Sequence, residues 1–124
     1  MKNLAAIVTA TGLTLGLTVT APAATLFTPG VFVQTGEGFE CRVTNVGRLN
    51  RTVQILIKDL FGDTLHDSGV AVLAAGAQHF LVIHEADFNE YCEFILQGGS
   101  SSYRAVGCTF SLPDGSSRDC LDAR

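Results

Sequence analysis

Four cysteines are the residues of this chain whose type and spacing bear most directly on its chemistry. They are Cys41, Cys92, Cys108 and Cys120. No two of them have the Cys-x-x-Cys spacing that is typical of zinc ribbons and thiol oxidoreductases. We therefore predict structural disulfides, without metal or redox chemistry. Four cysteines allow three pairings, and the choice between these depends on the strands that carry them.

Three histidines, His66, His79 and His84, and an acidic segment raise the question of a metal site. On a β-strand His79 and His84 point to opposite faces, and no helical pattern brings them together. The segment 85–90 contains carboxylates, but it lacks the ligand spacing and the internal glycine of a calcium loop. We expect a surface loop with Phe88 packed beneath it, and neither a metal nor a cofactor.

The motifs of hydrolases and nucleotide-binding proteins are missing from the sequence. Ser100, Ser101 and Ser102 have no Gly-x-Ser-x-Gly context, and the preceding glycines are not followed by the lysine of a phosphate-binding loop. A closed core formed by about one hundred residues leaves little volume for a substrate cleft. We predict that the protein is not an enzyme.

The N-terminus has the layout of a secretory signal. Lys2 is a short positive region, residues 4–19 carry no charge, and Ala21 to Ala23 fit the small-x-small cleavage pattern. We predict a signal peptide over residues 1–23 and a single domain over residues 24–124, secreted or periplasmic, where disulfides form. The alternative is an uncleaved membrane anchor, because the apolar run approaches the ~20 residues that span a bilayer.

The charge balance excludes two classes of partner. The formal net charge is −4, and loss of Lys2 with the signal makes the exported part more acidic. Nucleic acids and anionic membranes bind clusters of basic residues. The basic residues here are dispersed, so we expect neither partner: they include Arg42, Arg48, Arg51, Lys58 and Arg104.

Alternating apolar and polar residues predict β-strands along most of the chain. In the stretch Phe39–Gly47, three apolar side chains share one face before Asn45 and Gly47 break the strand, and residues 52–58 give the strongest strand signal. We expect residues 25–30 to be a lead-in and residues 84–90 to be the longest loop. The other expected strands are Val31–Val33, Ser68–Leu73, Gln78–Ile83, Tyr91–Leu96, Tyr103–Leu112 and a last one through Cys120.

These strands select one disulfide pairing. Cys41 and Cys92 lie among inward apolar residues on strands far apart in sequence, so they can meet across two layers. If residues 113–115 form a three-residue hairpin loop, Leu112 pairs with Ser116, and counting outward places Cys108 opposite Cys120. Opposed positions bring Cβ atoms within ~4.5 to 5.5 Å, close to disulfide range. We predict the pairs Cys41–Cys92 and Cys108–Cys120.

About seven or eight short strands with regular turns and no helical period predict an all-β antiparallel sandwich. The approach Asp87-Phe88-Asn89-Glu90-Tyr91 to Cys92 resembles the corner of an immunoglobulin-like domain. Residues 43–47 and 73–78 resemble the adhesion-related and fibronectin-like domains of exported bacterial proteins, and the predicted mature chain as a whole resembles a group of small exported bacterial proteins of this architecture. This resemblance implies an immunoglobulin-like sandwich over most of residues 26–124, and it assigns a function to no residue.

Two functional hypotheses follow. The first is an exported interaction module that binds an unknown protein or a surface glycan through its loops or an edge strand. The loops in question are residues 59–63, 84–90 and 98–102. The second is a structural subunit, pilus-like or coat-like, that self-associates through sheet edges, with Val31–Val33 as the expected edge. The first hypothesis is compatible with a monomer or with weak self-association.

Overall fold

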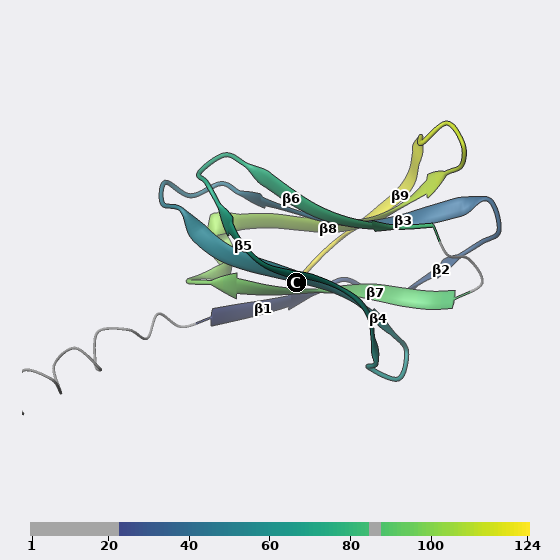
Figure 1. The fold of residues 1–124 in the computed structure, drawn as a ribbon, viewed down its shortest axis with the longest axis horizontal. Coiled ribbons are helices and arrows are strands. Elements are labelled where there is room, and N and C mark those ends of the chain that lie inside the picture. The colour runs from purple at the N-terminus through teal and green to yellow at the C-terminus, as the bar shows by residue number, and fades with distance from the viewer. Residues whose placement is uncertain (1–22, 85–87) are drawn as a thin grey trace, which may run out of the picture.

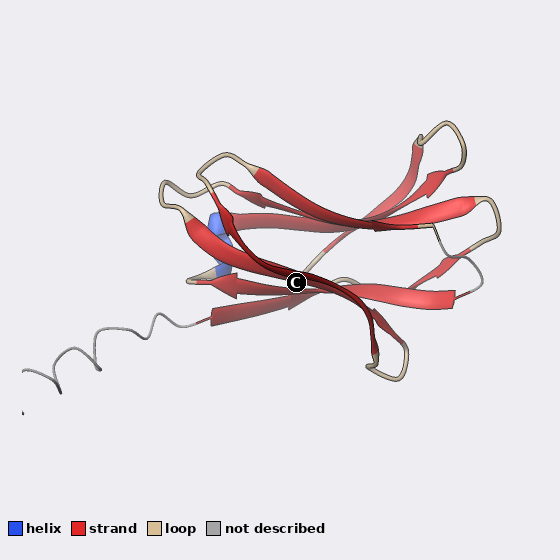
Figure 2. Ribbon diagram, viewed as in Figure 1, coloured by secondary structure: helices blue, strands red, loops and turns tan. Residues whose placement is uncertain are grey.

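The computed structural model describes residues 23–84 and 88–124, which form strands joined by short turns (Figures 1 and 2). The predicted signal peptide lies outside the described residues except for Ala23, the first residue of β1. One 3-10 turn, η1 (Ser100–Ser102), precedes β8. The strands are β1 (Ala23–Phe27), β2 (Val31–Val33), β3 (Glu37–Asn45), β4 (Arg51–Asp59), β5 (Thr64–Leu73), β6 (Gln78–Ile83), β7 (Phe88–Gln97), β8 (Tyr103–Ser111) and β9 (Ser117–Asp122).

Two antiparallel sheets are stacked as the layers of a sandwich (Figure 1). The first sheet has the strand order β1-β7-β4-β5. β1 and β2 pair with different parts of β7, β1 with residues 93–97 and β2 with residues 88–90. The second sheet has the order β6-β3-β8-β9. The predicted all-β antiparallel sandwich is confirmed.

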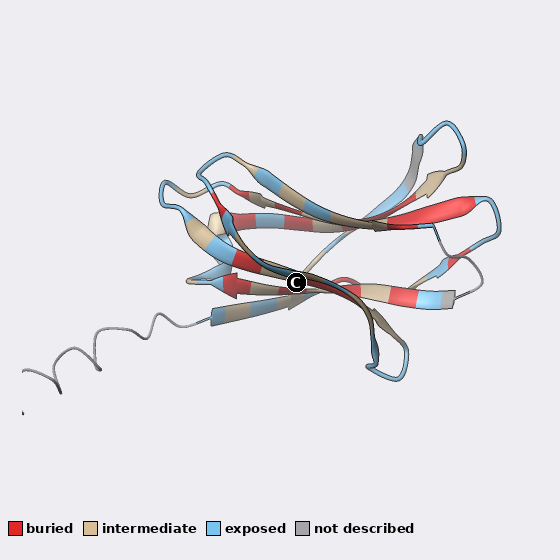
Figure 3. Ribbon diagram, viewed as in Figure 1, coloured by how far each residue is buried: buried red, intermediate tan, exposed pale blue. Residues whose placement is uncertain are grey.

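The alternation of residue types along β3 and β4 explains the core between the layers. Phe39, Cys41 and Val43 on β3 are fully buried, and Ile55 and Ile57 on β4 face them from the other sheet. The residues between them on β3 are only half-buried, which gives the banded pattern of Figure 3. A strand that buries one face against another layer requires this period of two.

The strand order differs from that of an immunoglobulin domain in one respect. In immunoglobulin domains the last strand joins the sheet of the third and sixth strands. Here the last two strands, β8 and β9, belong to the other sheet, where β8 pairs with β3 along its whole length. The place beside β7 is taken by β1. The face of β8 that carries Val106 and Phe110 is consequently the outer face, since these residues pair with the outward residues Arg42 and Gly38 of β3.

One disulfide joins the two sheets. Cys41 on β3 and Cys92 on β7 are both fully buried, with their Cα atoms 5.8 Å apart, as predicted. Gly107 on β8 leaves room for this bridge, because a Cβ at Gly107 would lie 2.9 Å from Cys92 Sγ and 3.2 Å from the ring of Phe39.

The second disulfide joins Cys108 on β8 to Cys120 on β9, two directly opposed residues of a hairpin. This pairing is also the predicted one. Cys108 lies on the outer face of the second sheet and is buried, whereas Cys120 is exposed. The two disulfides therefore occupy different environments, one between the layers and one at the surface.

The turn between β8 and β9 differs from the prediction by one residue. The backbone N–H of Ser111, not of Leu112, donates to the carbonyl of Ser116 over 2.8 Å. The turn therefore spans four residues rather than three. A register shift between Thr109 and Phe110 compensates for the extra residue, which is why the cysteines still lie opposite each other.

The N-terminal lead-in predicted over residues 25–30 is wrong in its first half. Residues 23–27 form β1, in which Leu26 pairs with Phe94 of β7. The segment has little β-branched character, so its own sequence predicts a strand only weakly. Pairing with the free side of β7 supplies the backbone hydrogen bonds that define it.

The loop predicted to run from His84 to Glu90 is shorter than expected. β7 begins at Phe88, and Glu90 is fully buried within it. Glu90 pairs with Val31 of β2 on one side and with Asp59 of β4 on the other. Two neighbouring strands thus extend β7 through residues whose polarity had indicated a loop.

Candidate functional site

The residues considered for chemistry from the sequence are spread over the sandwich. His66 is on β5, His79 on β6 and His84 directly after β6. Within residues 23–84 and 88–124, no group of three His, Cys, Asp or Glu side chains lies close enough to hold a metal ion. Glu85 and Asp87 lie outside the described residues, and Ser100 to Ser102 form η1.

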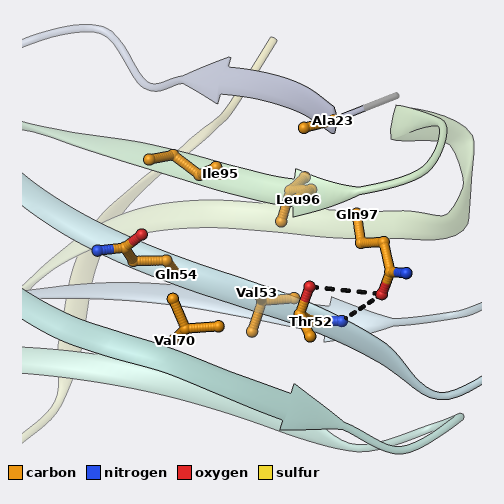
Figure 4. A pocket seen from close by; sticks show the side chains of 8 residues that line it. All are labelled: Ala23, Thr52, Val53, Gln54, Val70, Ile95, Leu96 and Gln97. Carbon is orange, nitrogen blue, oxygen red and sulfur yellow. Dashed lines mark hydrogen bonds between the residues drawn. The ribbon is translucent and has the colours of Figure 1, made fainter. Parts of the chain in front are cut away.

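A shallow depression of about 220 Å³ lies on the outer face of the five-stranded sheet (Figure 4). The side chain of Gln97 closes one end, where its Oε1 accepts hydrogen bonds from the Thr52 amide over 2.8 Å and from the Thr52 hydroxyl over 3.4 Å. The lining contains no carboxylate, imidazole or thiol. It consists of Ala23, Thr52, Val53, Gln54, Val70, Ile95, Leu96 and Gln97.

This outer face is mainly uncharged and includes an aromatic pair. Phe27 and Tyr91 approach with their ring centroids 6.2 Å apart. The charged side chains Lys58 and Glu93 form a salt bridge of 3.0 Å, and the hydrogen bond with Glu93 raises the pKa of Lys58 above its ordinary value. Apart from this ion pair, such a face can pack against an uncharged surface.

The turn between β4 and β5, residues 59–63, exposes two large apolar side chains, and we call it the hairpin tip. Phe61 is 90% exposed and Leu60 is 63% exposed. The tip is well ordered by hydrogen bonds, because Asp59 Oδ1 accepts from the amides of Phe61 over 2.9 Å and of Asp63 over 3.0 Å. The backbone also closes the turn, with the Asp59 amide donating to the Asp63 carbonyl.

A third exposed apolar side chain lies at the same end of the sandwich as the hairpin tip. Phe32 on β2 is 51% exposed. β2 and the end of β4 flank the same residue of β7, Glu90. Gly30, just before β2, is close to Leu60, since a Cβ there would lie 3.7 Å from Leu60 Cδ2. This end of the molecule therefore offers apolar side chains on short, connected segments.

The two lateral sides of the sandwich differ. On one side β1 is joined to the chain end after β9, because Phe27 and Arg124 exchange two backbone hydrogen bonds of 3.0 and 2.9 Å. We call this side the closed flank. On the other side lie the edges of β5 and β6, connected by a short turn at one end (Figure 1). We call this side the open flank.

The open flank presents a sheet edge that the sequence pattern did not predict. Val70 and Val72 on β5 are 70% and 72% exposed, and residues 68–78 carry no charge. The expected edge, Val31–Val33, is an edge strand of three residues only. The uncharged run was visible in the sequence, but its edge position follows from the strand order.

The sequence predicted a turn at residues 59–63, which the structure has, and named it as a candidate binding loop without separating Leu60 and Phe61 from the aspartates around them. A turn normally has polar residues at its centre, so a Leu-Phe pair between Asp59 and Asp63 was the available signal. No helix in the described part of the chain is long and apolar enough to cross a membrane.

The fold and these surfaces define a two-layer β-sandwich. No protein-family model matches the chain, and no curated protein matches it. Among solved structures, it is similar to the crystal structure of Thermotoga maritima 1070, with a TM-score of 0.57, 8% identity, and coverage of 85% of this chain and 96% of that chain. At this identity the likeness shows the fold alone.

A second solved structure, FLGD from P. aeruginosa, aligns over 84% of this chain and 74% of that chain. Its TM-score is 0.37 and its identity 10%, so this likeness supports no argument about fold or function.

Proposed function

We propose that this protein is an exported, non-enzymatic interaction module that binds another protein through the hairpin tip. The observation that supports this is the 90% exposure of Phe61 on a turn that hydrogen bonds hold in place. Burying a phenylalanine side chain contributes about 1.5–3 kcal/mol. A fixed turn loses little conformational entropy on binding, so more of this energy is retained as affinity.

The charges around the tip favour a protein partner over a membrane. Asp59 and Asp63 flank the two apolar residues, and the chain has a net charge of −4. Anionic lipid surfaces repel such a tip. A partner protein with an apolar pocket accepts Phe61 in the way that aromatic anchors fill pockets at the centre of interfaces.

Export is supported by the cysteines and the N-terminal sequence together. All four cysteines are in disulfides, which persist in oxidising compartments outside the cytoplasm. The signal-like residues 1–23 agree with this location. We place the working form of the protein in the periplasm or the medium.

Site-specific photo-cross-linking tests the proposed binding site. A photo-reactive amino acid replaces Phe61 in cells that export the protein, and the matched control carries it at Leu49. Leu49 is equally apolar and 64% exposed, but it lies in the turn before β4, at the opposite end of that strand from the tip. We expect a discrete cross-linked protein at position 61 that the control lacks.

Two results would contradict the proposal. One is the same set of products at positions 61 and 49, or none at 61, which would leave the tip without a specific partner. The other is co-sedimentation of the purified protein with phosphatidylcholine vesicles that is lost in Phe61→Ser, because that would assign the tip to a lipid surface.

A further inference from the structure

We infer that two copies of this chain associate through the open flank, with the β5 edges pairing antiparallel so that the two five-stranded sheets become one continuous sheet. The occupant of this edge is a second copy of the same chain. The proposed contact uses a surface other than the hairpin tip, so its test does not depend on the proposed function.

The direction of the backbone groups on β5 can be derived from β4. The Thr52 amide donates to Gln97 Oε1, on the β7 side of β4, whereas the Ile55 amide donates to Ser68 Oγ, on the β5 side. In an antiparallel pair, the residues that do not exchange hydrogen bonds point both backbone groups away from each other. Thr52 pairs with Val72 in this way.

Consequently the N–H and C=O groups of Val72 point away from β4, toward the open flank. Val70 is two residues earlier and pairs with Gln54, so its backbone groups point the same way. No strand of the described chain lies on this side of β5. The edge therefore offers two donors and two acceptors in the spacing that a further antiparallel strand requires.

Few features oppose pairing at this edge. Natural edge strands are usually protected by charges, prolines or short length. β5 has ten residues, and its first part carries Asp67 and a β-bulge between Asp67 and Val70. Residues 70–73 pair with β4 in regular register, and residues 68–78 contain no charge and no proline. By contrast, β9 carries Asp119 and Asp122, and β1 is joined to Arg124.

The edge is also complementary to itself. A two-fold axis through position 71 places Val70 opposite Val72 of the second copy, and Val72 opposite its Val70. Both pairs then use the backbone groups of Val70 and Val72 that point away from β4, and their side chains lie together on the outer face. Valine pairs directly opposed on a sheet stabilise strand pairing. Shifting the axis by one residue in either direction leaves a valine without a valine partner.

The expected association is weak and limited to two copies. Pairing one short strand buries less than the ~1,200 Å² typical of stable complexes. The closed flank offers a third copy a less favourable edge, because Phe27 of β1 already bonds to Arg124 and β9 carries Asp119 and Asp122, and two-fold pairing occupies the β5 edge of the open flank. A dimer therefore agrees better with the structure than the pilus-like or coat-like polymer considered from the sequence.

Sedimentation equilibrium over a concentration series up to the order of 1 mM tests the association, with three variants beside the wild type. In Val72→Lys, each copy of the dimer carries a lysine at the β5 edge, so two positive charges lie within the proposed contact. Phe80→Lys places a lysine at the β6 edge, the other edge of the open flank. Val46→Lys is the control, since Val46 is 48% exposed but lies in the turn after β3. All three positions are exposed, and circular dichroism verifies that each variant is folded.

We expect the wild type and Val46→Lys to form dimers at high concentration, and Val72→Lys to raise the dissociation constant about tenfold or more. A wild type that stays monomeric throughout the series overturns the inference, leaving the edge for an extended segment of another protein. Dissociation by Phe80→Lys with no effect of Val72→Lys also overturns it, because the pairing would then use β6.

The register has its own test. Val70→Cys and Val72→Cys proteins are oxidised separately and as a mixture, and the linked peptides are mapped. We expect the mixture to give a covalent dimer joined between positions 70 and 72 faster than either variant alone. If the Val72→Cys protein alone forms the covalent dimer fastest, the two-fold axis does not pass through position 71.

Discussion

At the scale of single residues, Asn45 illustrates what the sequence indicates and what it leaves out. Its identity predicts the end of a strand, and β3 does end there. The structure adds that Asn45 is fully buried and that its Nδ2 donates to the carbonyls of Leu49 and Leu73 over 2.8 and 3.0 Å. This side chain therefore holds the turn before β4 and the end of β5 together. Local propensity cannot reveal such a role, because it depends on where other turns come to lie.

Gly107 has a comparable hidden role and gives a sharp prediction. Gly107→Ala places a methyl group 2.9 Å from Cys92 Sγ and 3.2 Å from the ring of Phe39, both in the rigid core. Overpacking of this kind typically costs about 1–3 kcal/mol. We expect a loss of that size in the free energy of unfolding, measured with chemical denaturant.

The matched control is Gly99→Ala. Gly99 has ordinary backbone angles, with φ −76°, and a Cβ there would meet nothing closer than Ser101 Oγ at 3.9 Å. Its free energy of unfolding should change by less than about 1 kcal/mol. Equal losses in the two variants would show that the space beside the disulfide is not what Gly107 provides.

At the scale of elements, the alternation of residue types was sufficient where strands bury one face. It predicted β3, β4 and the central part of β7, and through them the bridge between Cys41 and Cys92. It failed for β1 and for the start of β7, because pairing with neighbouring strands defines these segments. The β8–β9 turn was predicted one residue too short, and only a register shift in the hairpin kept the second pairing correct. The exposed edge of β5 required the strand order, which no local pattern contains.

The positions of the two disulfides predict the order in which they are reduced. Cys120 is exposed, whereas Cys41 and Cys92 are fully buried between the layers. Thiol–disulfide exchange requires a thiolate to reach a sulfur atom. Under mild reduction of the folded protein, we expect Cys108 and Cys120 to react first.

Alkylation followed by peptide mass spectrometry measures this order. Labels should appear at positions 108 and 120 while 41 and 92 stay unlabelled, and the difference should vanish in denaturant, where all sulfur atoms are accessible. Simultaneous labelling of all four positions under native conditions would mean that the sheets separate as easily as the hairpin opens.

At the scale of the whole molecule, the difference between the two flanks determines how copies of the chain can meet. The last two residues close one side, since Ala123 donates to the Ala105 carbonyl over 2.9 Å and Arg124 exchanges two backbone hydrogen bonds with Phe27. The other side presents the β5 edge. A sandwich with one free flank forms a closed pair, whereas a sandwich with two free flanks can add copies without limit.

Deleting Ala123 and Arg124 should give a sandwich with two free flanks in place of one. The Phe27 amide loses its acceptor, so its hydrogen exchange should accelerate, as measured by exchange mass spectrometry. The freed β1 edge should also shift association from dimers to larger species in light scattering. Arg124→Ala is the control, because the bonds to Phe27 come from the backbone and survive loss of the side chain. If the truncated chain stops at dimers, the closed flank does not limit assembly, and the outer faces of the sheets must do so instead.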